Sequence, residues 1–168
     1  AEYWGGGMSW INLNEIRELD GRVCLETAAS VTAEGVRHSS AVVLPAGTVC
    51  FSRTASIGFV TVMGVPMTTS QDFVNWVCGD ELNPTYLMHA LLRSRQVLRA
   101  SSSGSTHKTI YVRDAERFAV LHPPRELQNE FARAVAKVAE SDALMSSDLS
   151  RLDALFASLQ HRAFRGEV

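Results

Sequence analysis

Residues 125–162 read RELQNEFARAVAKVAESDALMSSDLSRLDALFASLQHR and contain neither glycine nor proline, which predicts one long helix. Apolar residues recur in this stretch at alternating steps of three and four, with skips at Ser141 and Asp148. That spacing is typical of one helical face. At about 1.5 Å per residue, the helix would be on the order of 55 Å long. Its apolar face consists of Leu127, Phe131, Ala134, Val138, Met145, Leu152, Leu155 and Leu159.

This apolar face is longer than the rest of the chain can cover, so it predicts packing against a partner helix in a coiled coil or bundle. A second apolar row with Val135, Leu149 and Phe156 widens it. The alternative, a helix folded back wholly on its own domain, would need a larger domain. The residues expected to face the partner helix are Leu127, Phe131, Val138, Met145, Leu152, Leu155 and Leu159.

The chain before this helix is predicted to be rich in strands, because β-branched and aromatic runs alternate with Gly, Pro and Ser/Thr turns. Asn83 and Pro84 predict a capped helix start, with the helix running toward Leu98. Pro123 and Pro124 end the strand-rich part. The expected strands are 41–44, 48–51, 57–62, 72–77, 110–112 and 117–121. The fold class is therefore α/β (α+β): a mixed, strand-rich domain at 1–122, then a long coiled-coil-type α-helix at 123–168.

Composition restricts the class of protein. The 168 residues are 46% hydrophobic and 20% charged, which predicts a folded chain with a substantial core. Cys24, Cys50 and Cys78 are odd in number and lie in apolar runs, so we expect reduced thiols and no disulfide scaffold. No apolar stretch approaches the length of a membrane span, and the first residues form no signal peptide. We therefore expect a cytoplasmic protein.

No stretch of the sequence predicts catalysis. The run at Gly5 lacks the spacing of a dinucleotide loop, and no phosphate-binding loop follows Gly58. Cysteines and histidines lack the spacing of metal ligands. The double proline has His122 and Arg125 beside it, in place of the acid or amide and the aromatic ring of a DNA amino-methyltransferase motif. We expect no enzyme activity, no metal and no cofactor in this chain.

Charge is concentrated in the middle of the chain. Residues 89–117 carry six basic residues against two acidic ones, although the whole chain has a net charge of −2. Two polar, glycine-bearing loops, at 51–58 and 101–109, offer the hydroxyl and basic groups that contact DNA phosphates. Between them lies Gln71, whose amide can pair with an adenine edge. The alternative is that these are ordinary turns and solvated faces. The predicted DNA-facing residues are Arg53, Thr54, Ser56, Thr69, Ser70, Gln71, Ser105, Thr106, His107 and Lys108.

Several motifs in this order resemble the specificity subunit of type I restriction-modification enzymes. The motifs are EYWGGGMSWI at 2–11, GTVCFSR at 47–53 with IG at 57–58, TSQ at 69–71, GST at 104–106, PPRELQNE at 123–130, and LDAL at 152–155 through FRGE at 164–167. The resemblance covers nearly the whole chain, and order and spacing together make it specific.

The resemblance implies a target-recognition domain that binds one half of a bipartite duplex DNA site. Such subunits typically have two of these domains, each followed by a long helix, and this chain has one copy. The resemblance therefore implies a homodimer formed through the helix. It also implies adenine methyltransferase subunits that carry S-adenosylmethionine as partners, and a motor nuclease subunit as a further partner. Members usually have a further segment before the motif at Trp4. Whether the chain is a natural half subunit or a piece of a two-domain subunit stays open.

Two other functions remain open from the sequence. One is a non-catalytic helical protein-interaction adaptor, in which the basic stretch would be an ordinary solvated face. The other is the recognition end of a fused methyltransferase-nuclease. Steep salt dependence of DNA binding would separate DNA recognition from the adaptor.

Overall fold

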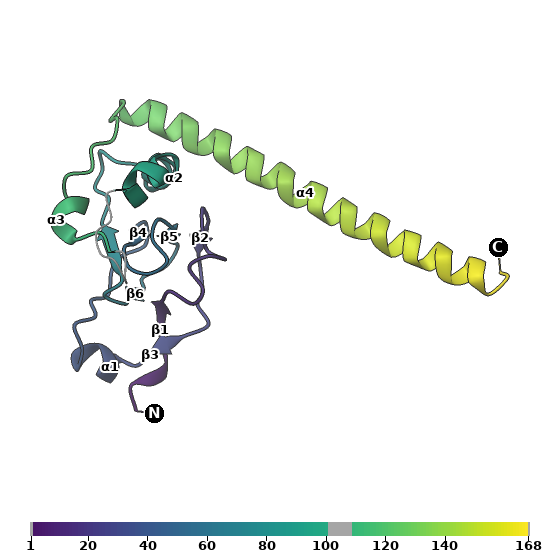
Figure 1. Ribbon diagram of the computed structural model, residues 1–168, viewed down its shortest axis with the longest axis horizontal. Coiled ribbons are helices and arrows are strands. Elements are labelled where there is room, and N and C mark those ends of the chain that lie inside the picture. The colour runs from purple at the N-terminus through teal and green to yellow at the C-terminus, as the bar shows by residue number, and fades with distance from the viewer. Residues whose placement is uncertain (1, 101–108, 168) are drawn as a thin grey trace. The chain divides into compact units, whose positions relative to one another are not determined.

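The computed structural model describes residues 2–100 and 109–167. The chain divides into two compact units, Ala1–Gln128 and Asn129–Val168. Within its described residues, the first unit combines two small sheets with short and medium-length helices, and the second is the greater part of one long helix (Figure 1). This is the α+β class with a long C-terminal helix that the sequence predicts.

The described strands form two sheets with the orders β3-β1-β6 and β2-β5-β4-β7. The strands are β1 (Trp4–Ile11), β2 (Val23–Cys24), β3 (Ser30–Val31), β4 (Val49–Ser52), β5 (Val60–Met63), β6 (Thr68–Thr69) and β7 (Phe73–Trp76). In the first sheet, β1 is antiparallel to β3 and parallel to β6. In the second, β4 lies antiparallel between β5 and β7, and β2 is parallel to β5.

Strand β4 is buried on both of its faces. Successive side chains of a strand point to opposite faces. Val49 and Phe51 accordingly pack in one core with Leu87 and Leu91, whereas Cys50 packs in a second core with Met63. The two cores together fix the position of β4, and therefore of the loop that leaves its C-terminal end.

The described helices are α1 (Ala33–Arg37), α2 (Pro84–Ala100), α3 (Val112–Ala115) and α4 (Arg125–Phe164). The start of α2 is confirmed as predicted. The Asn83 Oδ1 atom accepts hydrogen bonds from the backbone N–H groups of Thr85 at 2.9 Å and Tyr86 at 3.2 Å. Helix α2 contacts β4 and β5 through its buried leucines, and α4 runs without interruption as predicted.

Two predicted strands are wrong. Residues 110–112 and 117–121 form no strand, and Val112 instead begins α3. The N–H groups of Ala115 and Glu116 find partners one turn back, in the carbonyls of Tyr111 at 3.0 Å and Val112 at 2.9 Å. These local bonds satisfy the backbone without a neighbouring strand.

Three further expectations about strands need correction. Residues 41–44 contribute a single bridge, Leu44 to Met67, and no strand. The strand expected at 57–62 begins only at Val60, since Gly58 has a φ of 91°, which is incompatible with extended backbone. Strand β1 was not expected, because its glycines have low strand propensity. A Cβ atom on Gly6 would lie 2.4 Å from the Val31 carbonyl oxygen, so close pairing with β3 requires glycine there.

Candidate nucleic-acid interface

The β4–β5 loop, residues 52–59, is a closed turn. The Ser52 hydroxyl donates to the carbonyl of Ser56 and accepts from the N–H of Phe59 at 3.0 Å. The backbone of Ser52 also pairs with Gly58 and Phe59, each at 2.9 Å. Ala55 and Gly58 have positive φ values of 54° and 91°. The sequence therefore produces a loop of fixed shape around a buried serine. Of the predicted site residues on it, Thr54 and Ser56 are half-buried.

A second predicted segment, the 69–72 turn, is bonded to this loop by Arg53. The backbone N–H of Arg53 donates to the carbonyl of Asp72 at 2.8 Å. Its side-chain Nε donates to the carbonyl of Gln71 at 2.9 Å. Within the turn, the Ser70 hydroxyl donates to the Asp72 carboxylate at 2.9 Å. Arg53 therefore brings together the β4–β5 loop and the 69–72 turn, which are separate in the sequence.

The chain returns to the same loop at residue 109. Thr54 and Thr109 form an antiparallel bridge, and the N–H of Ile110 donates to the carbonyl of Arg53 at 2.9 Å. The remaining predicted residues, Ser105, Thr106, His107 and Lys108, lie outside the described residues.

The 69–72 turn borders an open depression of about 700 Å³. Thr69, Ser70 and Gln71 line it together with Trp10 and Asn75. Thr69 is 9% exposed, and its hydroxyl accepts from the Asn75 amide at 2.8 Å, so it contributes more to the shape than to the surface. Gln71 is exposed. Because its carbonyl is the atom bonded to Arg53, its side-chain amide can face a ligand.

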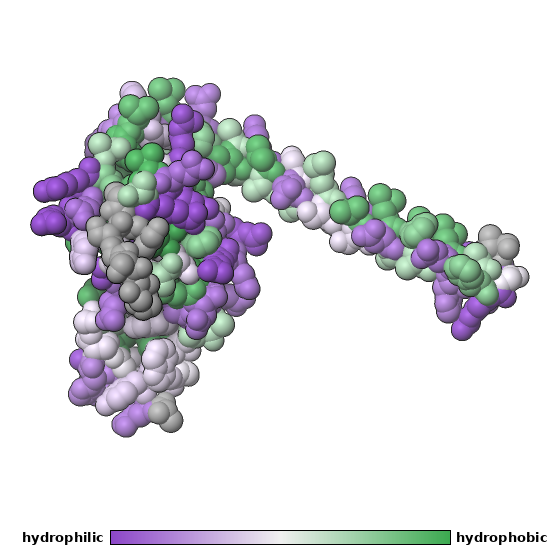
Figure 2. All heavy atoms as spheres, viewed as in Figure 1, coloured by the Kyte–Doolittle hydropathy of each residue, from purple (hydrophilic) through white to green (hydrophobic). Residues whose placement is uncertain are grey.

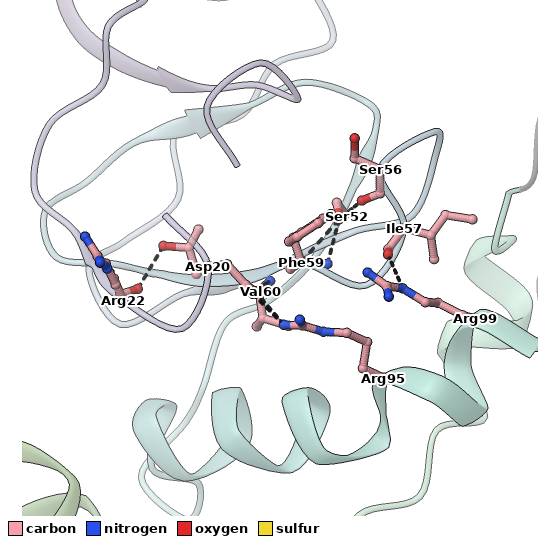
Figure 3. Close-up of polar contacts among 10 residues, drawn as sticks. Asp20, Arg22, Ser52, Ser56, Ile57, Phe59, Val60, Arg95 and Arg99 are labelled. Carbon is pink, nitrogen blue, oxygen red and sulfur yellow. Dashed lines mark hydrogen bonds and ion pairs between the residues drawn. The ribbon is translucent and has the colours of Figure 1, made fainter. Parts of the chain in front are cut away.

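The other side of the β4–β5 loop is held by arginines that the sequence analysis did not assign to the site. Arg95 and Arg99 reach from α2 to this loop (Figure 3). Arg95 Nη2 lies 2.7 Å from both carboxylate oxygens of Asp20, and Arg99 Nε donates to the carbonyl of Ile57 at 2.8 Å. The guanidinium carbons of Arg17, Arg95 and Arg99 lie 5.8, 5.4 and 5.5 Å from the centre of the Phe59 ring.

The arrangement offers groups for binding, and the three cysteine thiols are not activated as nucleophiles. Burial raises the pKa of Cys24, Cys50 and Cys78, whereas a reactive thiolate needs a lowered pKa. Burial lowers the pKa of His89. Across residues 2–100 and 109–167, no cluster of His, Cys, Asp and Glu could hold a metal ion. Within the same ranges, no helix has the length and apolar character to cross a membrane.

The residues predicted to face a partner helix are exposed along α4. Phe131 is 39% exposed, and the others are between 45% and 71% exposed. The described members are Leu127, Phe131, Val138, Met145, Leu152, Leu155 and Leu159. Figure 2 shows apolar residues along the length of this helix.

Residues 1–153 match the model of the family described as type I restriction modification DNA specificity domain, and the chain belongs to this family. The resemblance noted in the sequence is thereby confirmed.

Individual relatives agree with this assignment. The chain is 26% identical over 138 residues to the type I restriction enzyme MjaIX specificity subunit of Methanocaldococcus jannaschii, covering 80% of this chain and 32% of that protein. The HsdS subunit of Thermoanaerobacter tengcongensis has a similar fold, with a TM-score of 0.63 at 16% identity over 98% of this chain and 39% of that one. A chain from a structure of a type I R-M system gives a TM-score of 0.69 at 18% identity, over 98% of this chain and 40% of that one. The chain therefore spans 32–40% of the length of these proteins.

Proposed function

We propose that this chain is the part of a type I specificity subunit that recognises one half of a bipartite duplex DNA site. The observation that carries the proposal is the double bond of Arg53 to the backbone of Gln71 and Asp72. It places the small hydroxyl residues of one loop beside the exposed amide of another. Family membership supplies the ligand class, since the family is described as a DNA specificity domain.

In this proposal, the residues of the interface have two roles. The exposed Gln71 side chain reads a base edge, because an amide can donate and accept at the same time, as adenine requires. Hydroxyl groups of the β4–β5 loop, together with Lys108 and Arg53, contact phosphates and fix the register of the domain on DNA. Arg53 already uses Nε within the fold, so any phosphate contact would come from the outer end of its guanidinium.

The proposal also includes an assembly. The exposed leucines of α4 bury their surface against the corresponding helix of a second copy, and the paired helices set the spacing between the two half-sites. Adenine methyltransferase subunits that carry S-adenosylmethionine would dock there and modify the site, with a motor nuclease subunit as a further partner. The chain itself would be non-catalytic and hold no cofactor, and it would act in the cytoplasm, on cellular DNA.

Methylome sequencing with and without the gene tests this function. We expect one split adenine-methylation motif to disappear when the gene is deleted and to return when it is supplied on a plasmid. Unchanged methylation in a strain with active methyltransferase subunits would contradict the proposal. If the chain were a helical protein-interaction adaptor, purified assemblies would not bind duplex DNA even at low salt.

A further inference from the structure

Three cations gather on the β4–β5 loop at the Phe59 ring, and we call Arg17, Arg95 and Arg99 the arginine cluster. Asp20 is the carboxylate paired with Arg95, at 2.7 Å. Arg17 is exposed and forms no ion pair with any described residue. Arg99 is also exposed. Three arginines and one aspartate give the described part of the cluster a net positive charge, so the arginines repel one another.

Two members of the cluster, Arg95 and Arg99, are held in place by contacts within the fold. Asp20 accepts from the backbone N–H of Val60 at 3.0 Å and so fixes Arg95 against the start of β5. Arg99 is fixed by its bond to the Ile57 carbonyl. A Cβ atom on Gly58 would lie 3.0 Å from both Arg95 Cγ and Arg99 Nε, so the two side chains lie directly on the loop backbone.

This geometry matches what binding of a polyanion requires. The Arg99 guanidinium, which its bond to Ile57 already orders, loses little conformational freedom when it binds phosphate. Guanidinium groups bind phosphate through paired N–H groups. Arg53, which bonds to the 69–72 turn, lies on the same eight-residue loop as Ile57 and Phe59, which the arginine cluster contacts. The loop therefore joins the cluster to the turn.

We propose that the arginine cluster binds the phosphate backbone of duplex DNA, next to the residues that read bases. Arg17 and Arg99 contact phosphate oxygens, and Arg95, held by Asp20, positions the loop. The contact is independent of base sequence, because phosphates are the same at every step. The inference rests on the proposed function and adds the residues that would supply its electrostatic part.

The test uses the full chain, assembled with its methyltransferase subunits if these copurify, and measures fluorescence anisotropy of a labelled random-sequence duplex over a range of salt concentrations. The variants are Arg17→Gln and Arg99→Gln, with Arg17→Lys to retain the charge. The matched control is Arg93→Gln, which removes an exposed arginine from the same helix. Residues 93 and 99 are six positions apart, so their side chains point about 120° apart around α2.

We expect each Gln variant to weaken binding roughly three- to tenfold and to lower the salt slope by about one. We expect Arg93→Gln to bind like the wild type. Arg17→Lys should keep the wild-type salt slope, which depends on charge, and lose part of the affinity, because lysine lacks the paired N–H groups. Circular dichroism melting shows whether each variant is folded. If Arg99→Gln unfolds, Arg17→Gln decides the question alone, because the Arg17 guanidinium forms no ion pair with any described residue.

The outcomes separate the two proposals. If wild-type protein binds DNA and Arg17→Gln has the affinity and salt slope of Arg93→Gln, the inference is wrong and the proposed function stands. If Arg17→Lys lowers the salt slope as much as Arg17→Gln does, the positive charge at residue 17 does not contact phosphate, which also overturns the inference. If the wild type binds no duplex at any salt concentration, the proposed function fails and the inference fails with it.

Discussion

The buried side chain of Gln128 accepts a hydrogen bond from the backbone N–H of Asn83, at 2.8 Å from Oε1. Its Nε2 donates to the carbonyls of Pro123 at 2.8 Å and Glu81 at 3.1 Å. Gln128 has no exposed surface. One amide therefore connects the first turn of α4 to the residue that caps α2, and it explains why the first compact unit extends through Gln128.

Replacement of Gln128 by alanine should lower the free energy of unfolding by about 1–3 kcal/mol, because it removes a buried amide and leaves the Asn83 N–H and two part-buried carbonyls without their partner. Urea denaturation followed by circular dichroism measures the change. Gln160→Ala, at an exposed position of α4, is the matched control and should change stability by less than about 0.5 kcal/mol. Equal effects of the two substitutions would show that the buried amide does not connect the helices.

Gly58→Ala should destabilise the protein by about 1–3 kcal/mol. The positive φ of 91° is unfavourable for alanine, and the new Cβ atom would press on Arg95 and Arg99. Gly7→Ala is the control, since open space surrounds that position. Thermal melting of both variants provides the comparison. A Gly58→Ala protein as stable as Gly7→Ala would indicate that the loop adopts another backbone conformation.

Gln71→Ala should reduce discrimination between cognate and random DNA more than it reduces affinity. The Arg53 bond reaches the backbone carbonyl at 71, so alanine keeps the loop in place. Lys108→Ala should weaken binding to both DNAs alike. Competition binding with the motif identified by methylome sequencing measures the two effects. The assignment of roles is refuted if both substitutions cost the same discrimination.

Leu152→Asp should convert a dimer into monomers, because the side chain, 62% exposed in the single chain, would bury a charge between paired helices. Size-exclusion chromatography with light scattering measures the mass. Ser147→Asp introduces the same charge five residues away, on another side of the helix, and should leave the dimer intact. A dimer that survives Leu152→Asp would place the partner on a different surface.

Features set by local sequence could be predicted, and features set by distant contacts could not. The start of α2 depends on Asn83 and Pro84 themselves, and α4 on a regular apolar spacing, so both were found. The pairing of Asp20 with Arg95 spans 75 residues and leaves no periodic signal. The strand at Gly6 was missed for the same reason, since its need for glycine arises from the carbonyl of Val31.

The candidate site follows the same rule. Its residue types could be recognised from hydroxyl-rich and glycine-bearing segments, and Gln71 is exposed as a reading residue must be. That Thr69 is nearly buried depends on the pairing of β6 with β1, and that Arg53 bonds two loops together depends on the pairing of β4 with β7. The assignment of DNA contacts to individual residues stays a prediction.

The two hydrogen bonds of Arg53 end on the main-chain oxygens of residues 71 and 72, which every amino acid possesses. Mutation can therefore exchange the side chain at position 71 without loosening the turn that presents it. If residue 71 reads a base as proposed, a lineage with this architecture is free to acquire new target preferences one codon at a time, while the frame around that residue persists unchanged.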